Sequence, residues 1–214
     1  MDRVRITEPM TMITDYAMGA LACVFAMRLV GNASAGGQLS GRLWAAALLM
    51  TAVAAFVGGT YHGFIQWMAG ATGRAMWKAT LVATGAGSAC LLAAALVAGV
   101  AGPLRTALAG VVAAKLAFYV WTVARKDSFR LVIVDYGTAL VAVVLAAWLL
   151  RPSGLTPAAG WVTAGVAVAV VAGVIQWARL APHAHFNHND LFHVVQMASL
   201  YLLYRGGLLL RDMQ

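Results

Sequence analysis

Seven long apolar runs constrain the fold of this chain more than any other feature. They lie at about residues 13–30, 43–67, 76–100, 104–124, 129–150, 157–178 and 189–208. A helix of about 20 apolar residues is long enough to cross a bilayer. The segments between the runs are rich in Gly, Pro, Asn and charged residues, which commonly end helices. The sequence therefore predicts an all-α integral membrane protein, in which residues 1–214 form one domain, a bundle of seven transmembrane helices.

The composition agrees with a membrane location and argues against a nucleic-acid partner. The chain is 62% hydrophobic and only 10% charged, whereas soluble domains are about 25% charged. Its formal net charge is +8, but the lysines and arginines stand in small groups beside the apolar runs. That arrangement is typical of residues that orient membrane helices. A slight excess of them on the N-terminal side predicts a cytoplasmic N-terminus and an external C-terminus, and we expect a bacterial inner (plasma) membrane.

The tryptophans support the same division of the chain. Each lies within a few residues of the end of an apolar run: Trp44, Trp67, Trp77, Trp121, Trp148, Trp161 and Trp177. Tryptophan is enriched where membrane helices meet the headgroups. We therefore expect these side chains to form two aromatic belts.

The polar side chains of the apolar runs converge on one side of the predicted bundle. With seven spans, the end of the second helix and the beginnings of the first, fifth and seventh lie on the same side. The ionisable residues in these places are Glu8, Asp15, His62, Asp135, His188, Asp190 and His193. Ionisable groups in a membrane are costly, usually face the bundle interior and mark function. We therefore expect one polar layer that contains the functional site.

Lys115 lies outside this layer, near the middle of the fourth run. The fourth and fifth runs are joined by a short segment, which makes Asp135 its natural partner. An unpaired charge is costly in a membrane, so the sequence predicts a structural ion pair between Lys115 and Asp135. The alternative is that Asp135 takes part in the site.

The stretch HFNHNDLFHVVQM at 185–197 has the residues of half a metal site. Successive residues of a helix are about 100° apart, so Asp190 and His193 share a face, whereas His188 and His193 are about 140° apart. Together with His62, His193 and a third ligand from Asp190 or His188 suit zinc, since catalytic zinc sites use three protein ligands and one water. The alternative is an interfacial helix cap, because Asn and Asp are favoured at that position.

These features resemble the CREST superfamily, which includes the alkaline ceramidases and the progestin and adipoQ receptors. The likeness is carried by seven helices, His62 near the end of the second, and His193 in a motif that opens the seventh. In the first run, Glu8, Thr11 and Thr14 of EPMTMIT echo a Glu-x-x-Asn-x-x-Ser/Thr pattern. The resemblance implies a zinc ion held by His62 and by an HxxxH motif that ends at His193, and hydrolysis of a lipid amide.

The sequence also departs from that family. The first position of HxxxH is Asn189, the usual serine position is Gly58, and the third run opens as MWKATLV without an acid. A third zinc ligand would therefore come from Asp190, His188 or the Asn189 amide. The architecture carries over more completely than the activity.

Two functional hypotheses follow. The first is a zinc-dependent membrane hydrolase of a lipid amide or ester. In it, Asp135 or Asp15 is the general base or supports an imidazole, Thr60 replaces the missing hydroxyl, and the lipid substrate enters from the bilayer. The second is a non-catalytic lipid-binding or receptor-like protein, whose polar layer is a structural network. A weaker third possibility is an ion pathway through His62, Asp135 and Lys115.

Overall fold

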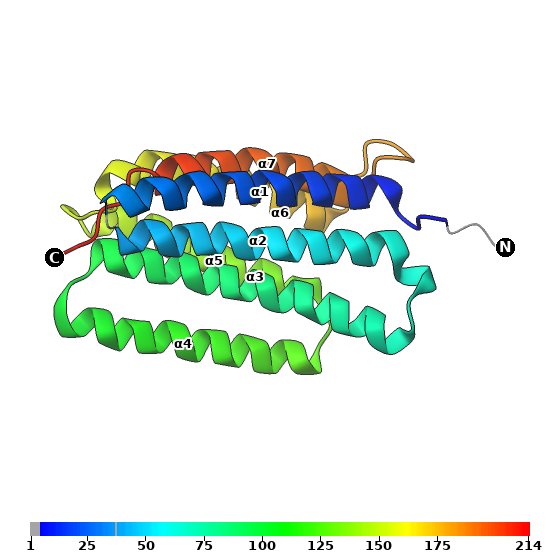
Figure 1. Ribbon diagram of the computed structural model, residues 1–214, viewed down its shortest axis with the longest axis horizontal. Helices are drawn as coiled ribbons and strands as arrows, with labels where there is room; N and C mark the ends of the chain where they lie inside the picture. Colours follow the sequence, from blue (N-terminus) through cyan, green and yellow to red (C-terminus); the bar gives the residue numbers. More distant parts are fainter. Residues whose placement is uncertain (1–4, 37) are drawn as a thin grey trace.

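The computed structural model describes residues 5–36 and 38–214, and in these residues the chain forms seven α-helices with two short 3-10 helices. The α-helices are α1 (Pro9–Gly36), α2 (Leu39–Phe64), α3 (Gly70–Gly99), α4 (Gly102–Arg125), α5 (Phe129–Leu149), α6 (Ala159–Ala178) and α7 (His188–Gly207). The 3-10 helices are η1 (Ile65–Trp67) and η2 (Thr156–Ala158). The long helices lie side by side along one direction (Figure 1).

The seven predicted helices are confirmed as helices. The largest differences are at two ends, where α1 continues to Gly36 and α3 begins at Gly70, through breaks that the sequence placed in loops. Both breaks contain alanine, the residue with the highest helix propensity, which offsets the cost of the glycines beside it. Among the described residues, six helices, α1 to α6, are long and apolar enough to cross a membrane, and α7, with its polar first half, is not one of them.

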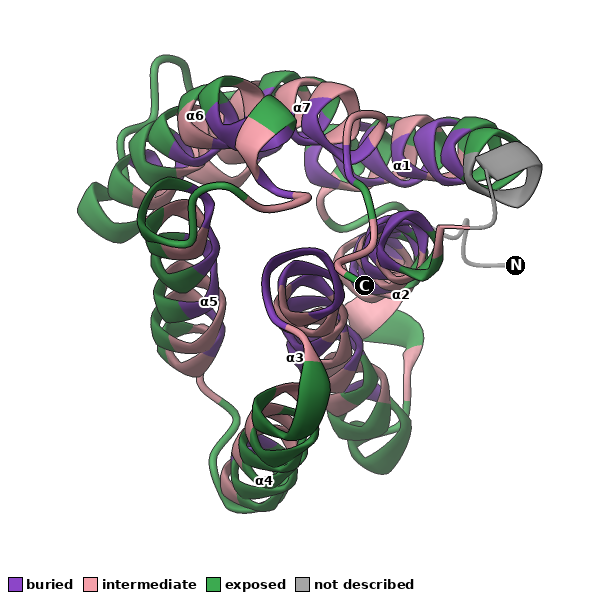
Figure 2. Ribbon diagram, turned by 90° about the vertical axis from the view of Figure 1, so that its left-hand side faces the viewer, coloured by how far each residue is buried: buried purple, intermediate pink, exposed green. Residues whose placement is uncertain are grey.

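The helices pack around α3 and α2, and α4 stays at the edge. Figure 2 shows α6, α7 and α1 in a row, with α3 in the middle and α4 outermost. The extensive contacts join α1 to α2, α2 to α3 and α6 to α7, whereas α4 rests mainly on α3. The core cluster is made largely of alanine, leucine and valine. Small side chains let helices approach closely, which drives packing in membranes.

Trp44 corrects the predicted aromatic belt. Its side chain is 0% exposed, and its Nε1–H donates to the Leu203 carbonyl of α7 at 3.0 Å. The ring packs so closely on Gly207 that a Cβ there would lie 2.6 Å from Trp44 Cδ1. A buried indole needs a partner for its N–H, and the α7 carbonyl supplies one. Trp44 therefore joins α2 to α7 instead of facing headgroups.

A polar clasp attaches α4 to the bundle, and it confirms the predicted ion pair. The Lys115 ammonium donates to Asp135 Oδ1 at 2.6 Å and to Ser88 Oγ at 3.0 Å. The Ser88 hydroxyl in turn donates to Asp135 Oδ2 at 2.5 Å. We call these three residues, from α4, α5 and α3, the α4 clasp. Each charge has two partners inside the protein, which is what an ion pair at membrane depth requires.

The C-terminal segment at 211–213 packs against the end of the bundle that lies opposite η1. Asp212 accepts hydrogen bonds from the backbone N–H groups of Leu39 at 2.7 Å and Ser40 at 2.8 Å. These are orphan donors at the start of α2, so Asp212 caps that helix from a distant part of the chain. Arg211 N donates to Gly154 O at 3.2 Å, and Met213 N donates to Val97 O at 2.9 Å.

Replacing Asp212 by alanine is expected to lower the free energy of unfolding by about 1 kcal/mol, because a helix cap is lost. Burial alone would raise the pKa of Asp212, but hydrogen bonds from Ser40 and Leu39 and the nearby Arg105 hold it below its ordinary value of 3.8. A lowered pKa in the folded state means that the carboxylate stabilises the protein above pH 3.8, and that this stabilisation disappears as the pH falls below it. Thermal melts of wild type and Asp212→Ala should therefore differ at pH 7, and the difference should shrink as the pH falls below 3.8.

Candidate functional site

The polar stretch at the start of α7 is first a helix cap. The Asn187 side chain accepts from the N–H groups of Asn189 at 2.7 Å and Asp190 at 3.3 Å. In return, Asp190 Oδ2 accepts from the Asn187 N–H at 2.7 Å. This reciprocal pair is a capping box, and it satisfies donors that the first turn would otherwise leave open. The cap fixes the rotation of α7 and so decides which side chains face the bundle.

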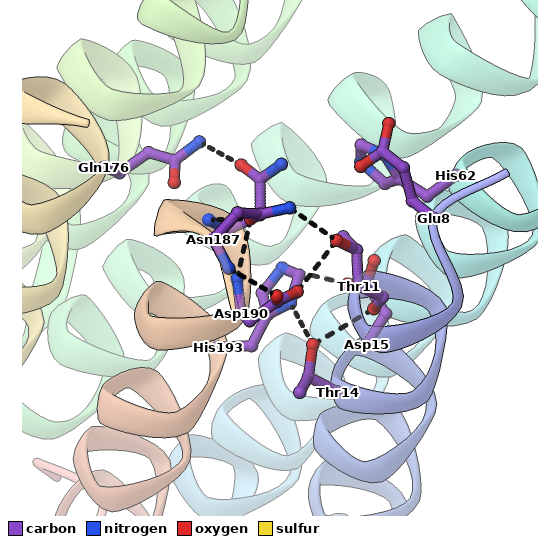
Figure 3. A network of polar contacts seen from close by, with 10 residues as sticks. Glu8, Thr11, Thr14, Asp15, His62, Gln176, Asn187, Asp190 and His193 are labelled. Carbon is purple, nitrogen blue, oxygen red and sulfur yellow. Dashed lines mark hydrogen bonds and ion pairs between the residues drawn. The ribbon is translucent and has the colours of Figure 1, made fainter. Parts of the chain in front are cut away.

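Asp190 also joins α7 to α1. It is 1% exposed, and its Oδ1 accepts from the Thr11 hydroxyl at 2.8 Å. Thr11 Oγ1 in turn accepts from the Asn187 side-chain amide at 3.3 Å. Both carboxylate oxygens of Asp190 are therefore occupied by protein donors. Figure 3 shows this network between the first turns of α1 and α7.

One turn deeper, His193 contacts α1 through both ring nitrogens. Its Nδ1 lies 3.0 Å from Thr14 Oγ1, and its Nε2 lies 3.1 Å from Asp15 Oδ1. The Thr14 hydroxyl donates its proton to the Thr11 carbonyl at 3.1 Å, so Nδ1–H is the donor to Thr14. Nε2 and Asp15 Oδ1 then share one proton, because two bare lone pairs would repel each other. The pair is an imidazole–carboxyl dyad with no net charge.

Asp15 reaches this position because α2 carries two glycines beside it. A Cβ at Gly59 would lie 2.9 Å from Asp15 Cβ, closer than real Cβ contacts. At Gly58 a Cβ would lie 3.8 Å from Asp15 Oδ2 and 3.4 Å from Thr80 Cγ2. The glycines thus allow close approach of α1 to α2. Asp15 is 4% exposed and lines a cavity, and its Oδ2 has no hydrogen-bond partner among the described residues.

His62 lies near this network without joining it. Its Nδ1 is 3.2 Å from Glu8 Oε2, and the two side chains are 19% and 38% exposed. Backbone bonds hold the segment before α1 against the end of α2, from Thr7 N to Gly63 O at 2.9 Å and from Glu8 N to His62 O at 3.2 Å. Figure 3 shows the Glu8–His62 pair to one side of the dyad. Of the two residues, only His62 lines the cavity.

The cavity has a volume of about 510 Å³, and every α-helix except α4 contributes residues to its lining. Its polar lining has ionisable and amide side chains and hydroxyls, namely Asp15, His62, His193, Asn189, Gln176, Gln196, Thr51, Thr80, Thr84 and Tyr136. The rest is lined mainly by Ala, Val, Gly, Leu and aromatic residues. Ligand pockets commonly have 300–1,000 Å³ and a few polar groups on apolar walls. The cavity therefore has the size and polarity of a site for an amphiphile.

Three predicted site residues lie elsewhere. Asp135 belongs to the α4 clasp, and Thr60 contacts the Tyr16 hydroxyl at 2.9 Å. His188 is half-buried in the first turn of α7 and makes no hydrogen bond or ion pair with the described residues. None of these three lines the cavity. The structure thus brings together Asp15, His62 and His193 at the cavity, with Asp190 behind them.

The residues expected to hold zinc do not fit that ion in this arrangement. Both nitrogens of His193 are engaged by Thr14 and Asp15, and both oxygens of Asp190 accept hydrogen bonds. His62 alone keeps a nitrogen free toward the cavity, whereas a zinc site needs at least three protein ligands. In the part of the chain that the structure describes, no three His, Cys, Asp or Glu side chains are grouped closely enough to hold a metal.

Several cavity residues were not predicted from the sequence. Gln176 donates to Asn189 Oδ1 at 2.9 Å, while its own Oε1 is buried without a partner among the described residues. Trp77, Phe129 and Phe192 also line the cavity. A polar glutamine one residue before Trp177, in an otherwise apolar run, was the signal for Gln176. The aromatic residues carried no signal, because aromatic side chains in membrane helices are common.

Together these features define a class, a bundle of seven α-helices, six of them apolar enough to span a membrane, around a cavity with a buried carboxyl–imidazole dyad. The chain belongs to the family described as "Family of unknown function (DUF6962)", whose model matches residues 10–212. Comparison with curated proteins and with solved structures finds no match.

Proposed function

We propose that this chain is an integral membrane protein that binds a lipid or another amphiphile. The apolar tail occupies the cavity, and the polar head meets Asp15, His62 and His193. The observation that carries this proposal is the cavity itself, about 510 Å³ with mainly apolar walls and with Asp15, His62 and His193 in its lining. The resemblance to the CREST superfamily, whose enzymes act on a lipid amide, supports a lipid ligand. This function corresponds to the lipid-binding hypothesis rather than to a zinc enzyme.

The proposal includes the placement of the chain in the membrane. All seven helices cross it, and α7 does so because its polar first half faces α1 and the cavity instead of lipid. Polar groups at membrane depth are tolerated when they are buried in the bundle. The N-terminus is cytoplasmic, and the membrane is a bacterial inner membrane.

The test uses cavity-filling variants at Gly173 on α6. A Cβ there meets no atom within 4 Å, and both neighbouring turns, at Ala169 and Gln176, line the cavity. We expect Gly173→Leu to bind dodecanol about tenfold more weakly than the wild type in nanodiscs, measured by native mass spectrometry. Gly160→Leu is the matched control, since Gly160 has equally open surroundings on the same helix but does not line the cavity.

Equal binding of dodecanol to all three proteins, or no binding to any, would contradict the proposal. Because both variants exchange glycine for leucine in α6, their helix propensity changes by the same amount. A melting temperature at or above that of the wild type would confirm that Gly173→Leu is folded.

Hydrolysis of the bound amphiphile is a second candidate, favoured by the free Oδ2 of Asp15 in the cavity. Asp15 takes a proton from water, and the water oxygen attacks the carbonyl carbon of an amide or ester. The bond to the leaving nitrogen or oxygen breaks, and that atom receives the proton, which leaves a fatty acid and an amine or alcohol. Incubation with N-dodecanoylethanolamine should then release laurate, and Asp15→Asn should abolish the release. Absence of laurate would leave a binding function alone.

A further inference from the structure

Aromatic rings from four helices surround the polar end of the cavity. Centroid distances are 6.2 Å from His62 to Trp77, 6.1 Å from Trp77 to Phe129, 6.2 Å from Phe129 to Phe192 and 5.4 Å from Phe192 to His193. All five side chains line the cavity. We call these five residues the aromatic collar. Its last member, His193, contacts the Asp15 carboxyl group, so a carboxyl group lies next to the collar.

The charges around the collar favour a cation. Glu8, Asp15 and Asp190 are three carboxyl groups, and the imidazoles of His62 and His193 are their ionisable counterparts. Because the Asp15–His193 dyad has no net charge, the comparison is between the carboxyl groups of Glu8 and Asp190 and the single imidazole of His62, and carboxyl groups are in excess. Among the described residues that line the cavity, none is lysine or arginine. A buried phosphate or carboxylate would therefore have no cationic partner, and an unpaired buried charge is costly.

The cations nearest in sequence to the collar have partners elsewhere. Lys78, next to Trp77, lies 3.4 Å from Asp127 Oδ1 and donates to the Ala124 carbonyl at 2.8 Å. Arg130, next to Phe129, stacks on Trp177 with its guanidinium carbon 5.2 Å from the ring centroid. Trp177 is thus already occupied by a cation, whereas the rings of Trp77, Phe129 and Phe192 have none.

Several hydrogen-bonding groups of the cavity can act only as acceptors. The hydroxyls of Thr51, Thr80 and Thr84 donate to backbone carbonyls of their own helices at 3.1, 3.2 and 2.9 Å, which leaves only oxygen lone pairs toward the cavity. Gln176 Oε1 is buried without a partner among the described residues. The amides of Asn189 and Gln196 are donors, but neutral ones. A ligand head that brings N–H groups or positive charge satisfies this lining best.

We propose that the aromatic collar and Asp15 form a binding site for the ammonium head of a cationic amphiphile, either a long-chain amine or a quaternary ammonium. Ammonium groups bind over aromatic faces, and this attraction strengthens when the site is desolvated. Binding of the cation displaces the proton that Asp15 shares with His193, so that the Asp15 carboxylate neutralises the buried charge. The inference rests on the proposed amphiphile-binding function and specifies the head group of the ligand.

The experiment compares ligands that share one tail. Dodecyltrimethylammonium, dodecylamine, dodecanol and laurate are titrated against the wild type in nanodiscs, with native mass spectrometry as the readout. We expect both ammonium ligands to bind at least about tenfold more tightly than dodecanol, and laurate to bind most weakly. Tighter binding of laurate, or equal binding of dodecanol and the ammonium ligands, would overturn the assignment. If none of the four ligands binds, dodecanol included, the result would instead contradict the proposed function.

Variants then locate the preference in the collar. Phe129→Leu and Trp77→Leu should each reduce the ammonium preference, that is, the ratio of ammonium to dodecanol affinity, several-fold. Trp77→Phe should retain most of the preference because a ring remains. Trp121→Leu is the control, since Trp121 is 52% exposed on α4 and does not line the cavity. An undiminished preference in both leucine variants would place the cation elsewhere and contradict the proposal.

Discussion

Replacing Lys115 by methionine is expected to lower the free energy of unfolding by about 3–5 kcal/mol, the usual cost of breaking a buried ion pair from one side. Methionine removes the ammonium that donates to Asp135 at 2.6 Å and to Ser88 at 3.0 Å. The Asp135 side chain, only 9% exposed, then loses its counterion. Because α4 has few other contacts with the bundle, we expect this helix to detach first. Thermal and denaturant unfolding in a mild detergent measure the effect.

Replacing the other partner, Asp135, should lower the free energy of unfolding by less. Lys115 is 28% exposed, and its long side chain can carry the ammonium toward a more polar region. Asp135→Leu is therefore expected to destabilise the protein less than Lys115→Met does. The double variant Lys115→Met/Asp135→Leu should recover most of the loss, since an apolar pair often replaces a buried ion pair without cost. If the double variant is as unstable as the sum of both single ones, the clasp does not act as an ion pair.

The second large effect is expected for Asp190→Ala, at about 3 kcal/mol. The substitution removes the reciprocal half of the α7 cap, worth about 1 kcal/mol. It also leaves the buried Thr11 hydroxyl without its acceptor, at about 1–3 kcal/mol. The loss of this junction between α1 and α7 should also loosen the dyad and weaken ligand binding.

Asp127→Ala is the matched control for Asp190→Ala. Asp127 pairs with Lys78 at the surface, where the two side chains are 42% and 36% exposed. Exposed ion pairs contribute less than about 1 kcal/mol, so this variant should remain near wild-type stability. Asp190→Asn should lie between wild type and alanine, because its amide oxygen still accepts one hydrogen bond. Equal melting temperatures for Asp190→Ala and Asp127→Ala would contradict a role of the junction in stability.

The sequence predicted the helices well because an apolar run of bilayer length has few other stable forms in a membrane. It also predicted which end of the bundle holds Asp15, His62 and His193, since that follows from counting spans. Counting spans does not give the direction of a side chain around its helix. Asp135 was therefore grouped with these residues, although it faces Lys115 on α4.

The expected zinc ligands show a second limit of sequence reasoning. The spacing of Asp190 and His193 correctly indicated one shared face of α7, and both are buried. Their partners, Thr11, Thr14 and Asp15, come from α1. The Thr11–Asp190 and Thr14–His193 pairs are each 179 residues apart in the sequence. Whether a histidine faces a metal or a carboxyl depends on which helix packs against it. That information resides in the packing of α1 on α7 and not in the spacing within either helix.

The contact between α1 and α7 has a consequence for how the protein is made. Chains fold in the order of synthesis, N-terminal parts first, so α1 is made with Asp15 long before α7 exists. During that interval the acid on α1 has no imidazole, and Thr11 and Thr14 lack the groups that they later contact on α7. When α7 arrives, its own polar first half finds those same groups. The two helices therefore complete each other, and the polar junction between them can form only after α7 has been made.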